Sequence, residues 1–321
     1  MNYIEGVKMI SIIIPTYKRF DYLKKAIQSV INQSYNNIEI IVINDHSEDE
    51  TRKIKEVFPQ IVYIENVSNK GPGYCRKMGL NYSTGDYIVF LDDDDYYTDY
   101  TFFNLAINHL EHNPKCVFVS ANADELYVGT GKIKENHLNV IGELSSVEYL
   151  RGFVSEYNKP LSTFTTVFRK ASLIESGVLE MNMVNDMSIF LRVLRKGNVF
   201  FLKNSVGIYR IHNENISKHI KLDFLIDNLK EKKEVYRYIK SNRLFDQYDL
   251  WWVFQIKTTV SYYVYGTIPK LQEMNKLYKW CCENSTNKLE IKIMFRYYYN
   301  YLIDYRICTF KRRIKKILRC S

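Results

Sequence analysis

The chain has 321 residues, of which 46% are apolar and 27 are tyrosine, so it is no disordered protein and is long enough for two domains. No run approaches the ~18 apolar residues of a membrane-spanning helix, and the amino terminus lacks a signal-peptide pattern, so we expect a cytoplasmic protein. The net charge of +9 is unevenly distributed along the chain. Residues 1–218 hold 24 Lys+Arg against 26 Asp+Glu, whereas residues 219–321 hold 21 against 10, which predicts an anionic partner for the carboxyl-terminal third.

The first 120 residues alternate between two hydrophobic periodicities. Short β-branched runs are typical of buried strands, and the stretches between them repeat apolar residues at helical spacing. This alternation predicts βαβ units and a mostly parallel sheet with helices on both faces. Ligands of such sheets bind outside the carboxyl ends of the strands, so the loops after residues 14, 43, 64 and 91 should meet. The expected strands are 10–14, 38–43, 61–64, 87–91 and 116–120, and the expected helices are 21–33 and 99–111.

Beyond residue 120 the pattern changes. Residues 121–145 read as polar loop and short strand, and past His219 the remaining sequence is helical in period. We therefore predict an α/β domain over residues 1–218 and a basic, aromatic-rich helical region over residues 219–321. The further elements expected within the first domain are strands at 163–168 and 199–211 and a helix near 184–195.

Four consecutive aspartates, Asp92 to Asp95, directly follow the expected strand at 87–91. Like charges at this spacing repel, and each raises the pKa of the others unless a cation lies between them. Carboxylate oxygens suit Mg²⁺ or Mn²⁺, which complete their coordination shell with substrate phosphates. The tetrad predicts a strand that presents a divalent metal to a phosphate-bearing substrate, and a solvated acidic turn is the alternative.

Three other loops are expected at the same edge. After the first strand, Tyr17 offers a ring on which a base could stack, although an ordinary turn has the same composition. After the second strand, Asp45 could accept a hydrogen bond from a base or ribose, although helix capping explains this loop almost as well. After the third strand, residues 69–77 contain two glycines and place Arg76 near a helix amino terminus, which predicts an auxiliary phosphate or base contact.

The order and spacing of these motifs resemble those of family 2 glycosyltransferases, over roughly residues 9–215. The resemblance implies the GT-A fold, a single α/β nucleotide-sugar domain. Two departures, Asn44 in place of a first aspartate and Lys77 in place of asparagine, do not carry the chemistry. The motifs are Ser-Ile-Ile-Ile-Pro-Thr-Tyr from Ser11, Asn-Asp-His-Ser from Asn44, Asn-Lys-Gly-Pro-Gly-Tyr-Cys-Arg-Lys-Met-Gly-Leu from Asn69 and Gly-Asp-Tyr-Ile-Val-Phe-Leu-Asp-Asp-Asp-Asp from Gly85.

The resemblance also implies residue roles. Pro15, Tyr17 and Asp45 are placed at the nucleobase. An Asp-x-Asp element, Asp92 and Asp94, is placed at the metal, for which Asp94 and His212 are the expected ligands of Mg²⁺ or Mn²⁺. The residues expected to bind the nucleotide sugar are Pro15, Tyr17, Arg19, Asp45, Arg76, Asp92, Asp93 and Arg210.

The family places its catalytic carboxylate just before a helix with a Leu-x-Leu-Arg-like tail, which here makes Asp186 the expected base. A sugar hydroxyl is a poor nucleophile, so a positioned carboxylate must take its proton. The alternative is that Asp186 only caps its helix. Tyr-Arg-Ile-His, ending at His212, resembles the family's closing segment, where an imidazole could bind Mn²⁺ or touch the diphosphate, and an ordinary surface histidine is the alternative.

Residues 306–319 combine an apolar helical face with six basic residues between 311 and 319. Such a helix suits an anionic membrane surface, and packing against neighbouring helices is the alternative. Nucleic acid is not expected, because no nucleic-acid-binding motif accompanies the charge. The many upstream tyrosines and tryptophans could fill a helical core, line an interface between copies of the chain or lie at a bilayer surface.

The sequence thus predicts a metal-dependent, inverting glycosyltransferase of the hexosyltransferase type. The expected donor is a nucleotide sugar, most simply a UDP-sugar, and the expected acceptor is a glycan or lipid-linked glycan of surface polysaccharide synthesis. We expect the protein in the cytoplasm or on the inner membrane face, and homo-oligomers through the carboxyl-terminal helices are a further hypothesis. The alternatives are a nucleotidyltransferase with the same sheet and a non-catalytic nucleotide-sugar-binding protein.

Overall fold

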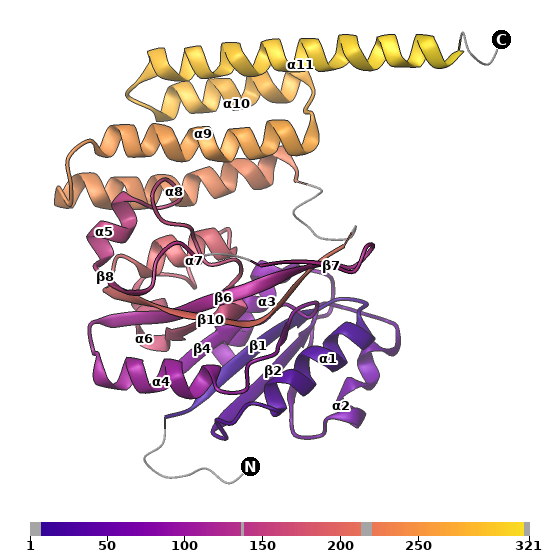
Figure 1. Cartoon of the computed structure of the whole chain (residues 1–321), viewed down its shortest axis with the longest axis vertical. Helices are drawn as coiled ribbons and strands as arrows, with labels where there is room; N and C mark the ends of the chain where they lie inside the picture. The colour runs from indigo at the N-terminus through magenta and orange to yellow at the C-terminus, as the bar shows by residue number, and fades with distance from the viewer. Residues whose placement is uncertain (1–7, 136–137, 213–219, 318–321) are drawn as a thin grey trace. The chain divides into compact units, whose positions relative to one another are not determined.

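The computed structural model describes residues 8–135, 138–212 and 220–317, with side chains as far as Thr309 in the last helix. The chain forms two compact units, Met1–Asn213 and Glu214–Ser321 (Figure 1). Each unit has buried apolar side chains of its own.

The amino-terminal unit alternates strands and helices through its first half, as its periodicity predicts. Its strands are β1 (Ile10–Thr16), β2 (Ile38–Asn44), β3 (Val62–Glu65), β4 (Tyr87–Phe90), β5 (Tyr96–Tyr97), β6 (Cys116–Tyr127), β7 (Lys132–Glu135), β8 (Gly142–Leu144), β9 (Thr166–Arg169) and β10 (Asn198–Ile211). Its helices are α1 (Phe20–Ile31), α2 (Ile54–Val57), α3 (Pro72–Tyr82), α4 (Phe102–His112), α5 (Ser146–Arg151), α6 (Lys170–Glu175) and α7 (Asp186–Val193), with 3₁₀ turns η1 (Glu50–Lys53) and η2 (Thr163–Thr165).

Within the described residues, ten strands form one sheet, whose main order is β3-β2-β1-β4-β9-β6-β10-β5. Strand β1 pairs in parallel with β2 and β4, β2 pairs in parallel with β3, and β6 pairs in parallel with β10. Antiparallel pairing is confined to pairs that contain β5, β7, β8 or β9. The expected α/β class with a mostly parallel central sheet is confirmed.

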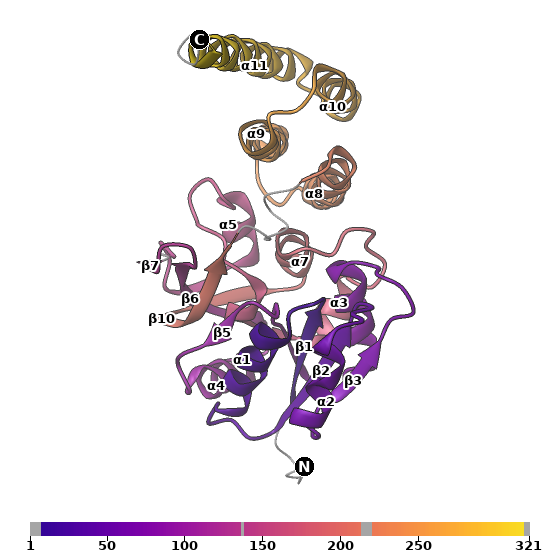
Figure 2. The ribbon, with the colours of Figure 1, turned by 90° about the vertical axis from the view of Figure 1, so that its right-hand side faces the viewer.

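Helices lie on both faces of this sheet (Figure 2). Successive strand residues point to opposite faces, so Ile12 joins the core beneath α1 and α4, whereas Ile13 faces α3. A Cβ atom added at Gly79 of α3 would lie 2.3 Å from Ile13 Cγ2. This glycine therefore lets α3 lie close against β1, and it brings Arg76, one turn earlier, to the carboxyl edge of the sheet.

Two elements differ from their sequence predictions. Strand β6 is twelve residues long and extends to Tyr127, into the segment expected to be polar loop and short strand, because its second half pairs with both β10 and β7. The strand predicted to begin at residue 163 begins at Thr166, after the turn η2. There Thr165 Oγ1 donates to the carbonyl of Ser162 (2.8 Å), and such side-chain bonds compete with strand pairing.

The carboxyl-terminal unit is helical, as predicted. Aromatic residues fill part of its core: the ring of Tyr236 stacks on that of Trp252, with centroids 5.5 Å apart, and Trp252 Nε1 donates to the carbonyl of Asn284 (2.8 Å). Other tyrosines, including Tyr262 and Tyr297, are exposed. The helices are α8 (Leu222–Asn242), α9 (Tyr248–Thr267), α10 (Leu271–Asn284) and α11 (Lys288–Ile317).

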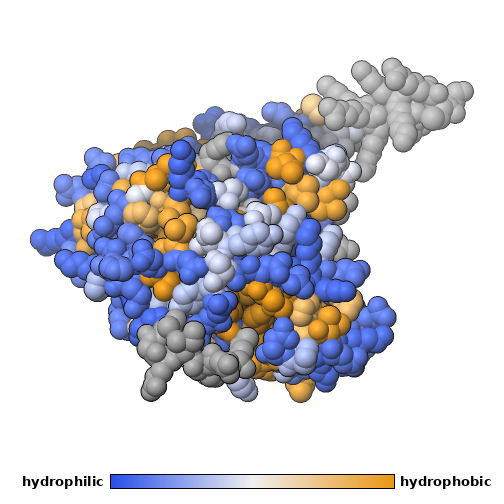
Figure 3. Space-filling model, turned by 60° about the horizontal axis from the view of Figure 1, so that its bottom comes forward, coloured by the Kyte–Doolittle hydropathy of each residue, from blue (hydrophilic) through white to orange (hydrophobic). Residues whose placement is uncertain are grey.

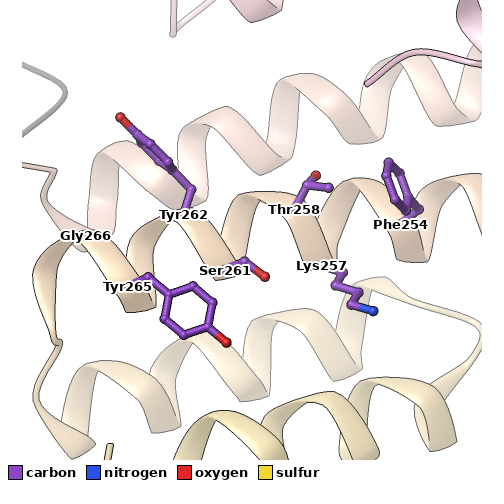
Figure 4. Close-up of a pocket in the computed structure, with 7 residues that line it drawn as sticks. All are labelled: Phe254, Lys257, Thr258, Ser261, Tyr262, Tyr265 and Gly266. Atoms are coloured by element: carbon purple, nitrogen blue, oxygen red, sulfur yellow. The ribbon is translucent and has the colours of Figure 1, made fainter. Parts of the chain in front are cut away.

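A groove of about 850 Å³ runs along α9, lined by Lys257, Ser261 and Tyr265 among others (Figure 4). On the face seen in Figure 3, hydrophobic residues form patches separated by hydrophilic ones. Among the described helices, none is both long and apolar enough to cross a membrane. Side chains beyond Thr309 and residues 318–321 lie outside the described part, so the cationic stripe at 306–319 stays a sequence prediction.

Candidate active site

Backbone hydrogen bonds join the loops at the carboxyl edge of the sheet. The amide of Asp45 donates to the carbonyl of Thr16 (2.8 Å), and the amide of Asn66 donates to the carbonyl of Asn44 (2.9 Å). Strand β4 pairs in parallel with β1, so the loop after β4 lies at the same edge. The loops after the first four strands therefore meet, as the βαβ pattern predicts.

The four aspartates form a tight, largely buried turn. The amide of Asp95 donates to the carbonyl of Asp92 (3.1 Å), and Asp93, Asp94 and Asp95 are buried. Burial raises the pKa of Asp92 to about 6. Burial, together with the adjacent Asp94 charge, raises the pKa of Asp93 to about 7. Since Asp93, Asp94 and Asp95 are buried and the Asp92 side chain is only 31% exposed, the turn is no ordinary solvated loop.

Arg19, from the loop after β1, forms ion pairs with two carboxylates of the aspartate turn. Its Nη1 lies 3.0 Å from Asp93 Oδ1 and 2.7 Å from Asp94 Oδ2. Thr16 Oγ1 donates to the other oxygen of Asp93 (2.8 Å). The guanidinium thereby offsets part of the repulsion between the two carboxylates.

Arg210 and His212, at the end of β10, close over the turn. Arg210 Nη1 donates to the carbonyl of Asp94 (2.6 Å), and the Arg210 amide donates to Asp95 Oδ1 (3.2 Å). His212 Nε2 lies 2.9 Å from Asp94 Oδ2. The structure thus brings both residues of the predicted Tyr-Arg-Ile-His segment to the aspartates, and His212 is no isolated surface residue.

Arg76 connects the aspartate turn to Asp186. Its Nη2 lies 2.5 Å from Asp92 Oδ1 and 3.6 Å from Asp186 Oδ1, and its Nη1 donates to the carbonyl of Val184 (3.4 Å). The side chain is 6% exposed. Arg76 was expected near the nucleotide, and in this structure it bridges two carboxylates.

Asp186 is not the cap of its helix. Asn185 is the N-cap of α7: its Oδ1 accepts from the amide of Ser188 (2.9 Å), and Ser188 Oγ accepts from the amide of Asn185 (3.0 Å). Asp186 occupies the first helical position, where Thr163 Oγ1 donates to its Oδ1 at 3.5 Å. The Asp186 carboxylate therefore lies next to Arg76 and Thr163 and does not cap its helix, so the expected alternative of an N-cap role is wrong.

Asp45 holds the glycine loop in place. Its Oδ1 accepts from Asn66 Nδ2 and from the Lys70 amide (both 2.8 Å), and its Oδ2 accepts from the Gly71 amide (2.7 Å). The same hydrogen bonds satisfy donors just before α3, where Gly71 has a φ of +84°. A nucleobase contact by Asp45 would add to this structural role.

The other two expected nucleobase residues differ in exposure. Tyr17 is 42% exposed, and Lys18 Nζ lies 5.1 Å from the centroid of its ring. Pro15 is buried within β1 opposite Ile43 and does not end the strand, which continues to Thr16. An exposed ring directly beyond the strand end can receive a base without rearrangement of the sheet.

Asp94 and His212 offer the donor atoms that a small divalent cation prefers. Mg²⁺ is commonly held by one or two carboxylates with substrate phosphates completing its shell, and imidazole is a good ligand of Mn²⁺. The described residues contain no cluster of three or more His, Cys, Asp or Glu side chains that could hold an ion. The oxygen and nitrogen that face each other at Asp94 and His212 fit the protein part of a site completed by substrate.

The two residues that depart from the family pattern, Asn44 and Lys77, both form hydrogen bonds with neighbouring groups. Asn44 Nδ2 donates to the hydroxyl of Tyr63 (2.8 Å), and its Oδ1 accepts from the amide of Ser47 (2.9 Å). Lys77 Nζ donates to the carbonyl of Met181 (3.0 Å). The lysine thereby ties α3 to the segment that precedes Asp186.

The sequence interpretation missed Thr16, Thr163, Tyr22 and Tyr96 near the site. Thr16 lies inside the Pro-Thr-Tyr motif, so its place in the motif was an available signal. The ring centroids of Tyr22 and Tyr96 lie 4.7 and 4.5 Å from Arg210 Cζ. No pattern in the sequence marks Thr163, which reaches Asp186 only through the fold.

Residues 11–177 match the model of the family described as "Glycosyl transferase family 2". "Glycosyltransferase GlyA" of Streptococcus pneumoniae is 42% identical over 91 residues, covering 27% of this chain and 13% of the relative. The Campylobacter jejuni "GalNAc(5)-diNAcBac-PP-undecaprenol beta-1,3-glucosyltransferase" is 28% identical over 218 residues, covering 64% of this chain and 66% of the relative. These matches thus span between 13% and 66% of the length of the two curated relatives.

The fold is also similar to solved structures. Staphylococcus aureus TarS 1–349 in complex with UDP-GlcNAc superposes with a TM-score of 0.70 at 17% identity, covering 93% of this chain and 91% of TarS 1–349. At this identity the likeness shows a shared fold, which is the expected GT-A architecture with a helical region after it. The match over more than half of the chain shows membership directly: this chain belongs to glycosyltransferase family 2.

Proposed function

We propose that this glycosyltransferase transfers a sugar from a UDP-sugar to a hydroxyl of a glycan or lipid-linked glycan, with inversion at the anomeric carbon. The observation that carries the proposal is the Arg76 bridge, which places Asp186 beside the buried aspartate turn at the carboxyl edge of the sheet. A nucleotide-binding edge and a candidate base are thereby held in one site, as a sugar transfer requires.

In the proposed reaction, Asp186 takes the proton of the acceptor hydroxyl while its oxygen attacks the anomeric carbon. The carbon–oxygen bond to the nucleoside diphosphate breaks as the new glycosidic bond forms. A single in-line displacement inverts the anomeric centre. Arg19, 20% exposed at the aspartate turn, would contact the diphosphate as a cation.

Asp94 and His212 would hold Mg²⁺ or Mn²⁺, a cofactor that supplies Lewis-acid stabilisation of the leaving diphosphate when bound. Asp92 and Asp93 would support the sugar nucleotide from the same turn. Pro15, Tyr17 and Asp45 would form the nucleobase end of the site, with the base stacked on the exposed ring of Tyr17.

The named relatives support the choice of donor and acceptor classes. The TarS structure contains UDP-GlcNAc, the Campylobacter enzyme is named for an undecaprenol-diphosphate-linked glycan, and Bacillus subtilis GgaB, 36% identical over 136 residues, is named for minor teichoic acid biosynthesis. The last two names refer to a lipid-linked glycan and to teichoic acid, which supports a setting in the synthesis of surface glycans. We propose the same setting for this protein.

Calorimetry with a panel of nucleotide sugars, with and without Mn²⁺, tests the donor. We expect one UDP-sugar to bind, and Asp94→Ala to weaken Mn²⁺-dependent binding by about tenfold or more, because the variant loses a proposed ligand. Asp246→Ala, an exposed aspartate of the carboxyl-terminal unit, is the control and should bind like wild type. Metal-independent binding that Asp94→Ala leaves unchanged would refute the metal assignment, and pyrophosphate release from a nucleoside triphosphate would favour the nucleotidyltransferase instead.

We further propose that residues 1–218 form the catalytic domain and that residues 219–321 attach it to an anionic membrane surface. The second segment carries a net charge of +11, from 21 basic and 10 acidic residues. Apolar side chains of α11, including Ile293, Tyr297 and Ile307, are exposed. Basic residues near an anionic bilayer contribute about 1 kcal/mol each, so a peripheral and reversible attachment is expected.

Co-sedimentation with anionic and neutral vesicles tests this attachment. Glutamine at four basic positions near the carboxyl terminus should weaken anionic-vesicle binding at least about tenfold, and salt should weaken wild-type binding by screening. The same loss in the control would assign the attachment to the charge of residues 219–321 as a whole and refute a specific role for their carboxyl-terminal end, whereas equal binding to both vesicle types would refute electrostatic attachment. The four positions are Lys311, Arg312, Lys315 and Lys316, and the four control positions on α8 and α10 are Lys230, Arg237, Lys276 and Lys279.

A further inference from the structure

Alternating cationic and aromatic side chains run from the surface of α1 to the aspartate turn. Lys25 Nζ lies 3.6 Å from the ring centroid of Tyr96. Arg210 Cζ lies 4.5 Å from the Tyr96 centroid and 4.7 Å from that of Tyr22. The Tyr22 ring lies 5.7 Å from the imidazole of His212, with an interplanar angle of 31°. Two tyrosine rings thus flank the guanidinium of Arg210, and one of them also contacts His212.

Three separate elements build this arrangement. Tyr22 and Lys25 lie three residues apart on α1, which places them on the same helix face. Tyr96 belongs to β5, which pairs with β10 through Ile208, two residues before Arg210. The elements α1 and β5 also pack on each other, so the two rings come from parts of the fold that are in contact.

The guanidinium that the rings hold is the one that fixes the aspartate turn. Arg210 Nη1 donates to the carbonyl of Asp94, and its amide donates to Asp95 Oδ1. Arg210 is 5% exposed, so a cation–π contact there is partly desolvated and is stronger than on an open surface. A guanidinium free to rotate would not hold the Asp94 main chain in one position.

We propose that Tyr22 and Tyr96 are positioning residues, which orient Arg210 and His212 so that Asp94 presents its carboxylate to the donor diphosphate and its cation. Neither tyrosine is assigned to contact the substrate. The proposal rests on the proposed function for the role of Asp94, whereas the orientation of Arg210 can be measured without any ligand.

If the aromatic faces of Tyr22 and Tyr96 orient Arg210, each position requires a flat ring, and side-chain volume or a hydroxyl group alone is not enough. Substitutions that separate these properties test the proposal. Phenylalanine keeps the aromatic face, whereas leucine keeps apolar volume without it. We therefore compare Tyr22→Leu and Tyr96→Leu with the matching phenylalanine variants. Tyr82→Leu, at an exposed position of α3, is the control for loss of a tyrosine.

The first measurement is hydrogen–deuterium exchange of the free protein in a peptide that contains the Arg210 amide. We expect faster exchange of this amide in both leucine variants, because its bond to Asp95 loosens, and wild-type exchange in the phenylalanine variants and in Tyr82→Leu. Unchanged exchange in the leucine variants, or equal acceleration by phenylalanine, would overturn the proposal. Since no ligand is needed, this result stands even if the proposed function fails.

The second measurement is calorimetric binding of UDP with Mn²⁺. The leucine variants should bind about tenfold more weakly, the loss that follows from about 1.4 kcal/mol of cation–π stabilisation, and the phenylalanine variants should bind within about twofold of wild type. In an Arg210→Met background, Tyr96→Leu should cause no further loss, because the guanidinium that the Tyr96 ring contacts is gone. A full additional loss there would assign Tyr96 a separate role and refute positioning. Absence of UDP binding by wild type would instead refute the proposed donor.

Discussion

Asp186→Asn should reduce sugar transfer by about 10²–10⁴-fold while leaving donor binding close to wild type. The amide cannot take the proton of the acceptor hydroxyl, so the loss should appear in kcat. The variant should fold, because Asn185 and Ser188 form the capping box of α7 without Asp186. The asparagine oxygen can still accept the hydrogen bond from Thr163, so the local geometry is kept.

Asp21→Asn provides the matched control for this prediction. Asp21 is also an acidic residue in the first turn of a helix, α1, and it is exposed. Its replacement reproduces the loss of a carboxylate at a helix amino terminus without touching the proposed base. Steady-state kinetics with the identified donor, alongside calorimetry of donor binding, separate the two effects. Near wild-type turnover by Asp186→Asn would remove Asp186 from the role of base.

Much of the amino-terminal unit was predictable because its signals are local. The runs Ile10–Thr16 and Ile38–Asn44 are rich in β-branched residues and buried, and α1 between them carries its own apolar stripe. Parallel pairing then places every strand end on one edge, so Arg19, Asp45 and the aspartate tetrad were expected together. Residues that are far apart in the sequence therefore meet at one edge of the sheet because the βαβ pattern repeats along the chain.

Contacts that depend on exact register were not predictable. Arg210 reaches the carbonyl of Asp94 across 116 residues of sequence, and it does so between rings from α1 and β5. The antiparallel insertion of β9 between β4 and β6 likewise leaves no mark in the periodicity of Thr166–Arg169. Such contacts arise from the packing of several elements at once, and no single segment encodes them.

The Arg76 bridge joins two such elements, and its removal should destabilise the protein strongly. Arg76→Met leaves the carboxylates of Asp92 and Asp186 without the cation that lies between them. Breaking a buried ion pair on one side costs about 3–5 kcal/mol, and the partial exposure of Asp92 favours a value of about 3 kcal/mol. Arg52→Met, which removes an exposed partner of Glu65, is the control and should leave the free energy of unfolding close to that of wild type.

The dependence of this loss on pH identifies its cause. Burial raises the pKa of Asp92 to about 6 even though Arg76 lowers it, so without Arg76 this pKa should rise further. The folded variant would then bind more protons than the unfolded chain, so its stability should fall as pH rises through the raised pKa. The difference in free energy of unfolding between wild type and Arg76→Met should therefore be largest near pH 8 and shrink towards pH 5.

Adding Asp92→Asn to Arg76→Met should recover part of the loss at pH 8, because one uncompensated carboxylate is removed. Denaturant titrations at several pH values measure all three proteins, and a loss independent of pH would show that Arg76 acts through packing rather than through its charge.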